Sequence, residues 1–390
     1  MTGLYCLKGK DVTNKYIIIG ADFVPTSSNQ DYFCNGQMNL IVDERTYALI
    51  NNASFRIFNL ETPLTDKKTP IEKCGPNLIA PTQTIRGYEQ LKVNLLTIGN
   101  NHILDQGEQG FISTISTLKN QGIDYVGGGT NLQDAIKPFL FEFSGKRIGI
   151  YACAEHEFSI AEENSCGANP YEPLESFDHV TELRRKCDFI VVLYHGGKEL
   201  YRYPSPGLQK TCHKFIEKGA NLVICQHSHC IGCEERYING TVVYGQGNFL
   251  FDNSDSEFWK TSLLICLDEE LKITYFPLVK NGNGVCAADE SLRETILGDF
   301  FNRSKEILQD GFINKEYKKY ANKMVPMYLM FFGARISLFY RLINRILRGR
   351  LFVVLYKILY NKALRLSLYD FITCEAHREL FREGIKEKDE

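Results

Sequence analysis

Six residues with oxygen or imidazole donors follow short apolar segments of this 390-residue chain. They are Asp22, Glu61, Asn101, His195, His227 and His229. Taken singly, each has an ordinary structural explanation, such as turn capping for Asp22 or a left-handed turn for Asn101. Together they form a mixed oxygen and nitrogen ligand set of the kind that suits Mn, Fe, Zn or Mg. The conjunction predicts a site for one or two divalent ions, with Mn, Zn or Fe as the expected metals.

The pair His227 and His229 is separated by one residue, so both rings can reach one metal or two adjacent metals. Two ions about 3.5 to 4 Å apart clamp a phosphoryl group and lower the pKa of water toward ~7, which makes a metal-activated hydroxide available. Glu61 has two carboxylate oxygens and is the natural bridge. We expect Asn101, His195 and His227 on one ion, and Asp22 and His229 on the other.

His102 lies next to Asn101 and three residues before Asp105. An imidazole outside the ligand shell can protonate a leaving oxygen, so we predict that His102 is the general acid. A nearby carboxylate fixes the tautomer of such a ring, which is the role expected of Asp105.

The segments that deliver these residues are apolar and rich in β-branched side chains, as in buried strands. The predicted strands cover residues 16–20, 55–60, 94–98, 188–193 and 221–224. Helical patterns at 109–120 and 205–218 end at Gly122 and Gly219, which predicts an α/β fold. Further strands at 137–143, 147–153, 241–244 and 262–267 follow one another without room for helices, which favours two sheets packed face to face with helices outside.

From about Asp289 the strand pattern gives way to helical patterns, so we place a domain at 1–288 and a helical extension at 289–390. The net charge is −2, yet residues 317–369 contain only basic charges. This asymmetry predicts a basic C-terminal module and excludes a uniformly basic nucleic-acid binder.

The tail also carries an apolar stripe edged by Arg341, Arg345 and Arg348. Such a helix either lies on an anionic membrane or packs on the catalytic domain or a second subunit. A basic face can also guide a polyanionic substrate. No apolar run reaches the ~20 residues of a membrane span, and the N-terminus lacks the apolar core of a signal peptide. The expected location is the cytoplasm, including peripheral contact at the inner face of the membrane.

The chain has 13 cysteines without a repeating spacing, which predicts reduced, buried thiols. Cys230 and Cys233 have the spacing of half a structural zinc site, but no second pair accompanies them. The glycines at 127–129 lack the following Lys-Ser/Thr of a P-loop and predict a tight loop.

The order and spacing of several segments resemble the CapA family over roughly residues 16–252. These segments are 19–22, 59–64, 100–107, 195–199 with 204–206, 227–229 and 247–249; residues 125–129 and Glu235 fall where that family also has recurrent features. The resemblance implies a four-layer αββα sandwich of the metallophosphoesterase (calcineurin-like) type with a metal centre. It also implies substrate contacts for Asn59, Glu199, Glu235 and Asn248.

CapA-type proteins are associated with bacterial capsule and poly-γ-glutamate biosynthesis. The resemblance therefore predicts a metal-dependent hydrolase of phosphoesterase type, with an anionic polymer or phosphorylated substrate and capsule synthase partners. In the superfamily the first motif usually reads Asp-x-His, whereas here Val24 occupies the histidine position. The alternative is a non-catalytic accessory or scaffold protein of a capsule synthase with a vestigial metal site.

Overall fold

The computed structural model describes residues 15–251, 256–333, 345–346 and 359–385. The chain divides into two compact units, Met1–Ile313 and Asn314–Glu390. The first unit contains every predicted site residue.

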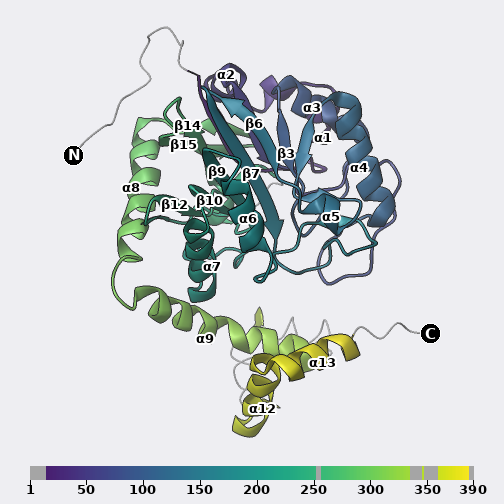
Figure 1. Cartoon of the computed structure of the whole chain (residues 1–390), viewed down its shortest axis with the longest axis vertical. Coiled ribbons are helices and arrows are strands. Elements are labelled where there is room, and N and C mark those ends of the chain that lie inside the picture. Colours follow the sequence, from purple (N-terminus) through teal and green to yellow (C-terminus); the bar gives the residue numbers. More distant parts are fainter. Residues whose placement is uncertain (1–14, 252–255, 334–344, 347–358, 386–390) are drawn as a thin grey trace. The chain divides into compact units, whose positions relative to one another are not determined.

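The first unit is built on two sheets (Figure 1). The eight-stranded sheet has the order β16-β15-β14-β1-β2-β3-β4, with β13 paired to β1. Its strands are β1 (Ile17–Phe23), β2 (Phe55–Asn59), β3 (Leu95–Thr97), β4 (Asp124–Val126), β13 (Asn248–Leu250), β14 (Thr261–Leu267), β15 (Ile273–Asn281) and β16 (Gly284–Ala287). Strands β1 to β4 are parallel, and β14 to β16 continue the sheet as antiparallel strands.

The second sheet has six strands in the order β11-β12-β10-β9-β7-β6. They are β6 (Phe139–Phe143), β7 (Lys146–Ala154), β9 (Phe189–His195), β10 (Leu222–Gln226), β11 (Glu234–Tyr237) and β12 (Gly240–Tyr244). The four central strands are parallel and the two edge strands are antiparallel. A separate pair joins β5 (Gly128–Gly129) to β8 (Gly167–Ala168).

Three apolar clusters separate four layers. In β1, Ile17 and Ile19 pack between the two sheets, whereas Ile18 faces the helices that cover the first sheet. Successive side chains of a strand point to opposite faces, so a strand covered on both sides reads as a continuous apolar run. In β9, Val191 faces the first sheet and Val192 the outer helices. The αββα sandwich implied by the resemblance is confirmed.

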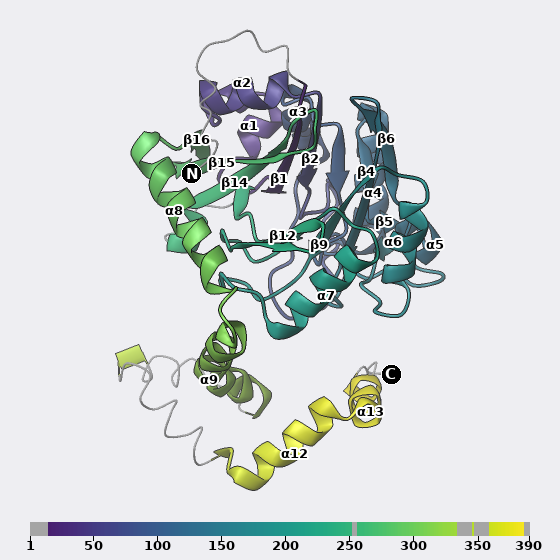
Figure 2. The ribbon, with the colours of Figure 1, turned by 60° about the vertical axis from the view of Figure 1, so that its left-hand side comes forward.

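Helices cover both outer faces (Figures 1 and 2). On the side of the first sheet lie α1 (Gln30–Cys34), α2 (Glu44–Asn52), α3 (Ile85–Gln90) and α4 (Gly107–Gln121); α5 (Leu132–Ala135) contacts the β5–β8 pair; on the second sheet lie α6 (Ser176–Arg184) and α7 (Pro206–Glu217). The predicted helices at 109–120 and 205–218 correspond to α4 and α7. Gly122 ends α4 with a left-handed φ of 70°, and the Ser205 side chain caps the first turn of α7.

Helix α8 (Glu290–Glu306) runs along one edge of both sheets (Figures 1 and 2). Its Phe300 is fully buried in the cluster between the sheets, and the Ser304 hydroxyl accepts the main-chain N–H of Glu234. The compact unit therefore continues through α8, whereas the change from strand to helix in the sequence occurs at Asp289. The compact unit ends beyond Asp289 because the apolar face of α8 completes the core.

The second unit contains most of α9 (Phe312–Gly333), together with α12 (Lys362–Thr373) and α13 (Glu375–Ile385). Asn361 caps α12 through the N–H of Leu364 at 3.0 Å. The predicted stripe with Arg341 and Arg348 lies outside the described residues. Within the described ranges, no helix is both long and apolar enough to cross a membrane.

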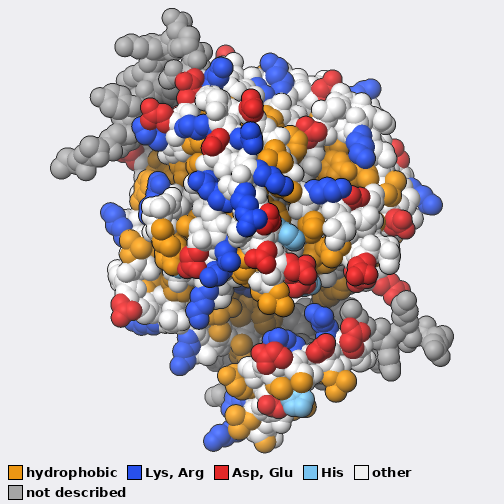
Figure 3. Space-filling view, in the orientation of Figure 1, with side chains coloured by type: hydrophobic (Ala, Val, Ile, Leu, Met, Phe, Trp, Pro, Cys, Tyr) orange, Lys and Arg blue, Asp and Glu red, His pale blue; other side chains and the backbone are white. Residues whose placement is uncertain are grey.

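Basic side chains gather on the face of the first unit where α6 and α7 lie (Figure 3). Arg147, Arg184, Arg185 and Lys186 line a shallow hollow there. They lie at the amino ends of β7 and β9, whereas the predicted metal ligands follow carboxyl ends of strands. Basic charge is thus not confined to the tail.

Candidate metal centre

The carboxyl ends of five parallel strands bring the six predicted ligands together. Asp22 lies in β1, Glu61 follows β2, Asn101 follows β3, His195 ends β9, and His227 and His229 follow β10. Ligands in open α/β sheets gather at this end of the strands because every parallel strand points its following loop to the same edge. All six side chains are buried, with exposed fractions from 0% for Glu61 to 9% for His229.

One group of donors consists of Glu61, His195 and His227, whose ligand atoms all lie within 4.8 Å of one another. Nε2 of His195 lies 3.3 Å from Oε1 of Glu61 and 2.9 Å from Oδ1 of Asn101. The Asn101 amide oxygen is therefore placed to complete this group.

A second group consists of Asp22, Glu61 and His229, again with ligand atoms within 4.8 Å. Nδ1 of His229 lies 3.2 Å from Oδ2 of Asp22 and 2.9 Å from Oδ1 of Asn248. The Asn59 amide donates to the other Asp22 oxygen at 2.7 Å. Asp22 pairs with both Asn59 and Asn248 in the strand register, so the neighbouring strands bring the Asn59 amide to Asp22 and the Asn248 amide to His229.

Glu61 is common to both groups, which is the arrangement expected of a bridging carboxylate. Both of its oxygens are fully buried and lack a hydrogen-bond donor. An ionised carboxylate buried without donors is strongly unfavourable unless a cation neutralises it. The donor set and these oxygens therefore fit a divalent cation.

The charge states of His195 and His227 fit the same assignment. Burial lowers the pKa of His195 to about 4 and that of His227 well below its usual value, so both rings are neutral and have a lone pair to offer. Burial, followed by the charge of Asp22, raises the pKa of Glu61 to about 8. Burial opposes charge on His229, but its hydrogen bond to Asp22 and the charge of Glu61 outweigh burial and raise its pKa to about 10.

The backbone is strained where the two histidines leave β10. His227 has φ of 80° and His229 has φ of 52°. Residues other than glycine are uncommon at positive φ, and such residues cluster at functional sites. With this backbone conformation both rings of the His-x-His pair lie in the cluster, and their centroids are 6.0 Å apart.

His102 lies beside the metal groups and is held by a buried carboxylate. Its Nδ1 is 2.6 Å from Oδ2 of Asp105, which also accepts the main-chain N–H of Leu78 at 2.6 Å. The ammonium of Lys73 contacts the other Asp105 oxygen and lies 3.3 Å from His102 Nδ1. The ring is thereby fixed through Nδ1, which leaves Nε2 for a substrate.

The four predicted substrate contacts fall in different places. Asn59 and Asn248 hold the ligands Asp22 and His229, and half-exposed Glu199 lies 3.9 Å from His227. Glu235 is buried elsewhere, where it accepts from Tyr244 at 2.7 Å and lies 3.0 Å from His213 of α7. The structure therefore does not bring Glu235 to the cluster.

Two residues of the site were not predicted. Oε2 of Glu157 accepts the Asn101 amide at 2.9 Å, and its Oε1 lies 3.9 Å from Nε2 of His227. Glu157 follows β7, so the pattern of polar residues after strands could have predicted it. Lys73 lies in a loop without regular structure, and nothing in the local sequence marks it.

Val24 and the cysteines lie outside the ligand groups. Val24 is buried, with 1% of its surface exposed, and carries no donor atom. Neither metal-binding group found among the described residues contains a cysteine. Cys230 and Cys233 are buried small side chains, and the zinc alternative receives no support.

Comparison with known proteins identifies relatives of this chain. The model of the family described as "Bacterial capsule synthesis protein PGA_cap" matches residues 28–253. "Capsule biosynthesis protein CapA" of Bacillus anthracis is 27% identical over 213 residues, 52% of each chain. "PGA biosynthesis protein CapA" of Bacillus subtilis is 26% identical over 232 residues, 58% of each chain. A "probable polyglutamine synthesis accessory protein" of Mycobacterium tuberculosis is 25% identical over 56% of this chain and 63% of that protein.

The matched region thus spans little more than half the length of these relatives. Among solved structures, a phosphatase from Mycoplasma pneumoniae aligns with 15% identity and a TM-score of 0.42, over 69% of this chain and 94% of that one. A 5′-nucleotidase precursor from Thermus thermophilus aligns with 14% identity and a TM-score of 0.39, over 74% of this chain and 58% of that one. Similarities at this level do not bear on activity.

Proposed function

Because the chain belongs to the family of bacterial capsule synthesis proteins, we propose that it is a metal-dependent hydrolase of phosphoesterase type that acts in capsule or poly-γ-glutamate biosynthesis. Two relatives are named for capsule and PGA biosynthesis, which supports the proposed pathway. The proposed substrate is an anionic polymer or a phosphorylated compound, and the proposed partners are components of a capsule synthase.

The observation that carries the proposal is the position of Glu61, buried and shared by two ligand groups. Asn101, His195 and His227 would hold one ion with Glu61, and Asp22 and His229 would hold the other. A divalent ion there, Mn, Zn or Fe, supplies Lewis acidity toward a phosphoryl or carbonyl oxygen and acidifies water.

The remaining site residues act on protons and orientation. We assign His102 as the proton donor to the leaving oxygen, through the nitrogen that Asp105 does not hold. Asp105 fixes the ring and its tautomer, and Lys73 holds the Asp105 carboxylate in place. Asn59 and Asn248 orient the ligands Asp22 and His229.

Metal analysis of the purified chain tests this proposal. The wild-type protein should retain Mn or Zn in stoichiometric amount and hydrolyse a generic phosphodiester with added Mn. Glu61→Gln keeps the size of the side chain but removes its charge, so it should lose both metal and hydrolysis. Glu163→Gln, on an exposed glutamate, is the matched control and should behave as wild type. Retention of metal by Glu61→Gln overturns the assignment of the centre.

A non-catalytic accessory role is the second candidate. The observation that favours it is Val24, whose buried side chain has no atom that could bind a metal ion. The M. tuberculosis relative is itself named an accessory protein. His102→Ala separates the two functions, since the enzyme needs His102 and a scaffold does not. Capsule production that survives His102→Ala but is lost on truncation after Ile313, where the first compact unit ends, supports the scaffold.

The C-terminal extension, residues 289–390, has a proposed role of its own. We propose that its basic segment contacts anionic lipid or a synthase partner at the inner face of the membrane. Binding to vesicles that contain anionic lipid, compared with neutral vesicles, tests this role.

A further inference from the structure

The segment after β7, residues 155–159, is attached to two of the loops that carry proposed metal ligands. The main-chain N–H of Glu155 donates to the carbonyl oxygen of His195 at 3.0 Å. The hydroxyl of Ser159, which is fully buried, donates to the carbonyl oxygen of Asn101 at 2.7 Å. Both ends of the segment are therefore fixed beside the first ligand group, the one that His195 belongs to and Asn101 completes.

Within this segment, Glu157 holds the side chain of Asn101. Its Oε2 accepts the Asn101 amide N–H at 2.9 Å, while Oδ1 of the same amide lies 2.9 Å from Nε2 of His195. An ionised carboxylate can only accept hydrogen bonds, whereas an amide has a donor end and an acceptor end. Glu157 therefore selects the orientation in which the oxygen of Asn101 faces the first ligand group.

The orientation of this amide decides whether Asn101 can be a ligand. The amide oxygen has lone pairs to offer a metal ion, whereas the amide nitrogen presents N–H groups and repels a cation. The terminal torsion of an asparagine side chain is broad and roughly two-fold, so both orientations are open to an amide without a fixed partner. A partner outside the ligand group has to distinguish them, and Glu157 is in that position.

We propose that Glu157 is a positioning residue of the first ligand group, which holds the Asn101 amide with its oxygen toward the ion. This inference rests on the proposed function, because it assumes the metal centre, but it does not depend on which bond is hydrolysed. Carboxylates that bond a ligand from outside the ligand shell typically change metal affinity tenfold to about a hundredfold.

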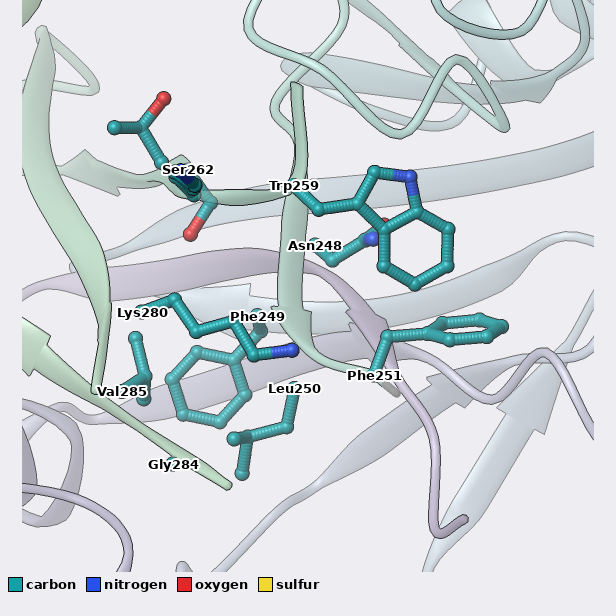
Figure 4. A pocket seen from close by; sticks show the side chains of 11 residues that line it. Asn248, Phe249, Leu250, Phe251, Trp259, Ser262, Lys280, Gly284 and Val285 are labelled. Carbon is teal, nitrogen blue, oxygen red and sulfur yellow. The ribbon is translucent and has the colours of Figure 1, made fainter. Parts of the chain in front are cut away.

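The second ligand group is held by different residues. Oδ1 of Asn248 lies 2.9 Å from Nδ1 of His229, and the Asn59 amide donates to Asp22 at 2.7 Å. The Asn248 side chain lies beside the ring of Trp259 (Figure 4), whose centroid is 5.1 Å from that of the His229 ring. Loss of the Glu157 carboxylate should therefore weaken the binding of one ion and leave the other unchanged.

Glu199 allows the amide contact to be separated from the effect of charge. Oε1 of Glu199 and Oε1 of Glu157 both lie 3.9 Å from Nε2 of His227, and the two side chains are similarly exposed, 48% and 41%. That distance is too long for a hydrogen bond, so both act on His227 through their charge. Of these two residues, Glu157 is the one that bonds Asn101. Substitution of either removes the same charge, but substitution of Glu157 also removes the bond to the amide.

Calorimetric titration of the chelated, full-length protein with Mn²⁺ alone tests the proposal. Glu157→Leu removes the acceptor at similar size and should weaken one binding step about tenfold or more. The other step should change less than about twofold, the size expected for a ligand group that Glu157 does not contact. Asn101→Ala and Asp22→Asn identify the steps, since the weakened step should be the one lost in Asn101→Ala. Glu199→Leu is the matched control and should weaken that step less than Glu157→Leu.

A change of polarity gives a readout that a merely structural role would not produce. Glu157→Gln keeps an oxygen that accepts the Asn101 amide, so it should bind the first ion more tightly than Glu157→Leu. In Asn101→Asp, two carboxylates face each other. Adding Glu157→Gln to Asn101→Asp provides an N–H donor for the new carboxylate and should strengthen first-ion binding. The same substitution should thus weaken binding beside asparagine and strengthen it beside aspartate, which is a coupling between the two positions.

The outcomes separate this proposal from the proposed reaction. Selective weakening of the first step supports the role of Glu157 even in a protein that hydrolyses no phosphodiester. Unchanged affinity in Glu157→Leu, equal weakening by Glu157→Leu and Glu199→Leu, or equal weakening of both steps overturns that role while the metal centre stands. A wild-type protein that binds no Mn²⁺ overturns both. Near-wild-type circular dichroism and an unchanged second step show that each variant is folded.

Discussion

Nδ1 of His102 lies 2.6 Å from Oδ2 of Asp105, a carboxylate with no exposed surface that also neutralises the buried ammonium of Lys73. One carboxylate therefore orients the proposed acid and balances a buried cation. This geometry underlies the two roles proposed for Asp105, one in stability and one in chemistry.

Asp105→Asn should reduce the free energy of unfolding by about 3 kcal/mol, since it leaves the ammonium of Lys73 buried without its counter-charge. Urea denaturation measures the change. Glu182→Gln is the control, because the Glu182–Arg185 pair is exposed on both sides; it should change the stability by less than about 1 kcal/mol. Equal effects of the two substitutions would show that Lys73 does not depend on Asp105.

Removal of metal should lower the thermal stability of the first unit, since the chelated site retains carboxylate oxygens without donors. Saturation with Mn at about 100 times the dissociation constant stabilises a protein that binds only when folded by about 2.7 kcal/mol. Differential scanning fluorimetry with and without Mn measures this shift. Asp22→Asn should reduce it and the exposed-site variant Glu163→Gln should retain it; a shift of full size in Asp22→Asn contradicts the assignment of that ligand.

Val24→His should strengthen the second ion's binding, because it restores the imidazole that the superfamily motif has two residues after Asp22. We expect about tenfold tighter binding of that ion, the scale on which single contributors to metal sites act. Titration of the chelated protein with Mn, followed by calorimetry, measures both steps. Val24→Thr is the control of similar size without an imidazole, and it should leave the two affinities unchanged. Identical titrations for the histidine and threonine variants would mean that position 24 does not face the site.

Gly127→Ala should be much more destabilising than Gly145→Ala, although both glycines have left-handed φ values, 80° and 75°. A Cβ on Gly127 would lie 2.7 Å from the Cβ of Ala152, whereas nothing lies within 4 Å of one on Gly145. The shared backbone strain costs about 1 kcal/mol, and the clash at Gly127 should add about 1–3 kcal/mol. Chemical denaturation of both variants isolates the clash as their difference, and equal stabilities would contradict the close approach of β4 and β7.

The residue types of the predicted ligands and the strands that carry them could be read from the sequence. The apolar runs before Asp22, Glu61, Asn101, His195 and His227 form buried parallel strands, because strands covered on both faces must be apolar throughout. Since such strands deliver their following loops to one edge, the convergence of these residues could be inferred without coordinates. The helices ending at Gly122 and Gly219 were also predictable, because left-handed helix ends select glycine.

The surroundings of the predicted ligands depend on tertiary packing. The loop that carries Lys73 has no periodicity, and its contact with Asp105 depends on packing between segments distant in sequence. The separation of Glu235 from the cluster depends on how β11 pairs at the edge of the second sheet. The contact between Asn248 and His229 depends on the pairing of β13 with β1. Local patterns specify which residues share a strand face or a strand end, but the pairing of strands and the packing of two sheets are long-range interactions, and these determine which side chains meet.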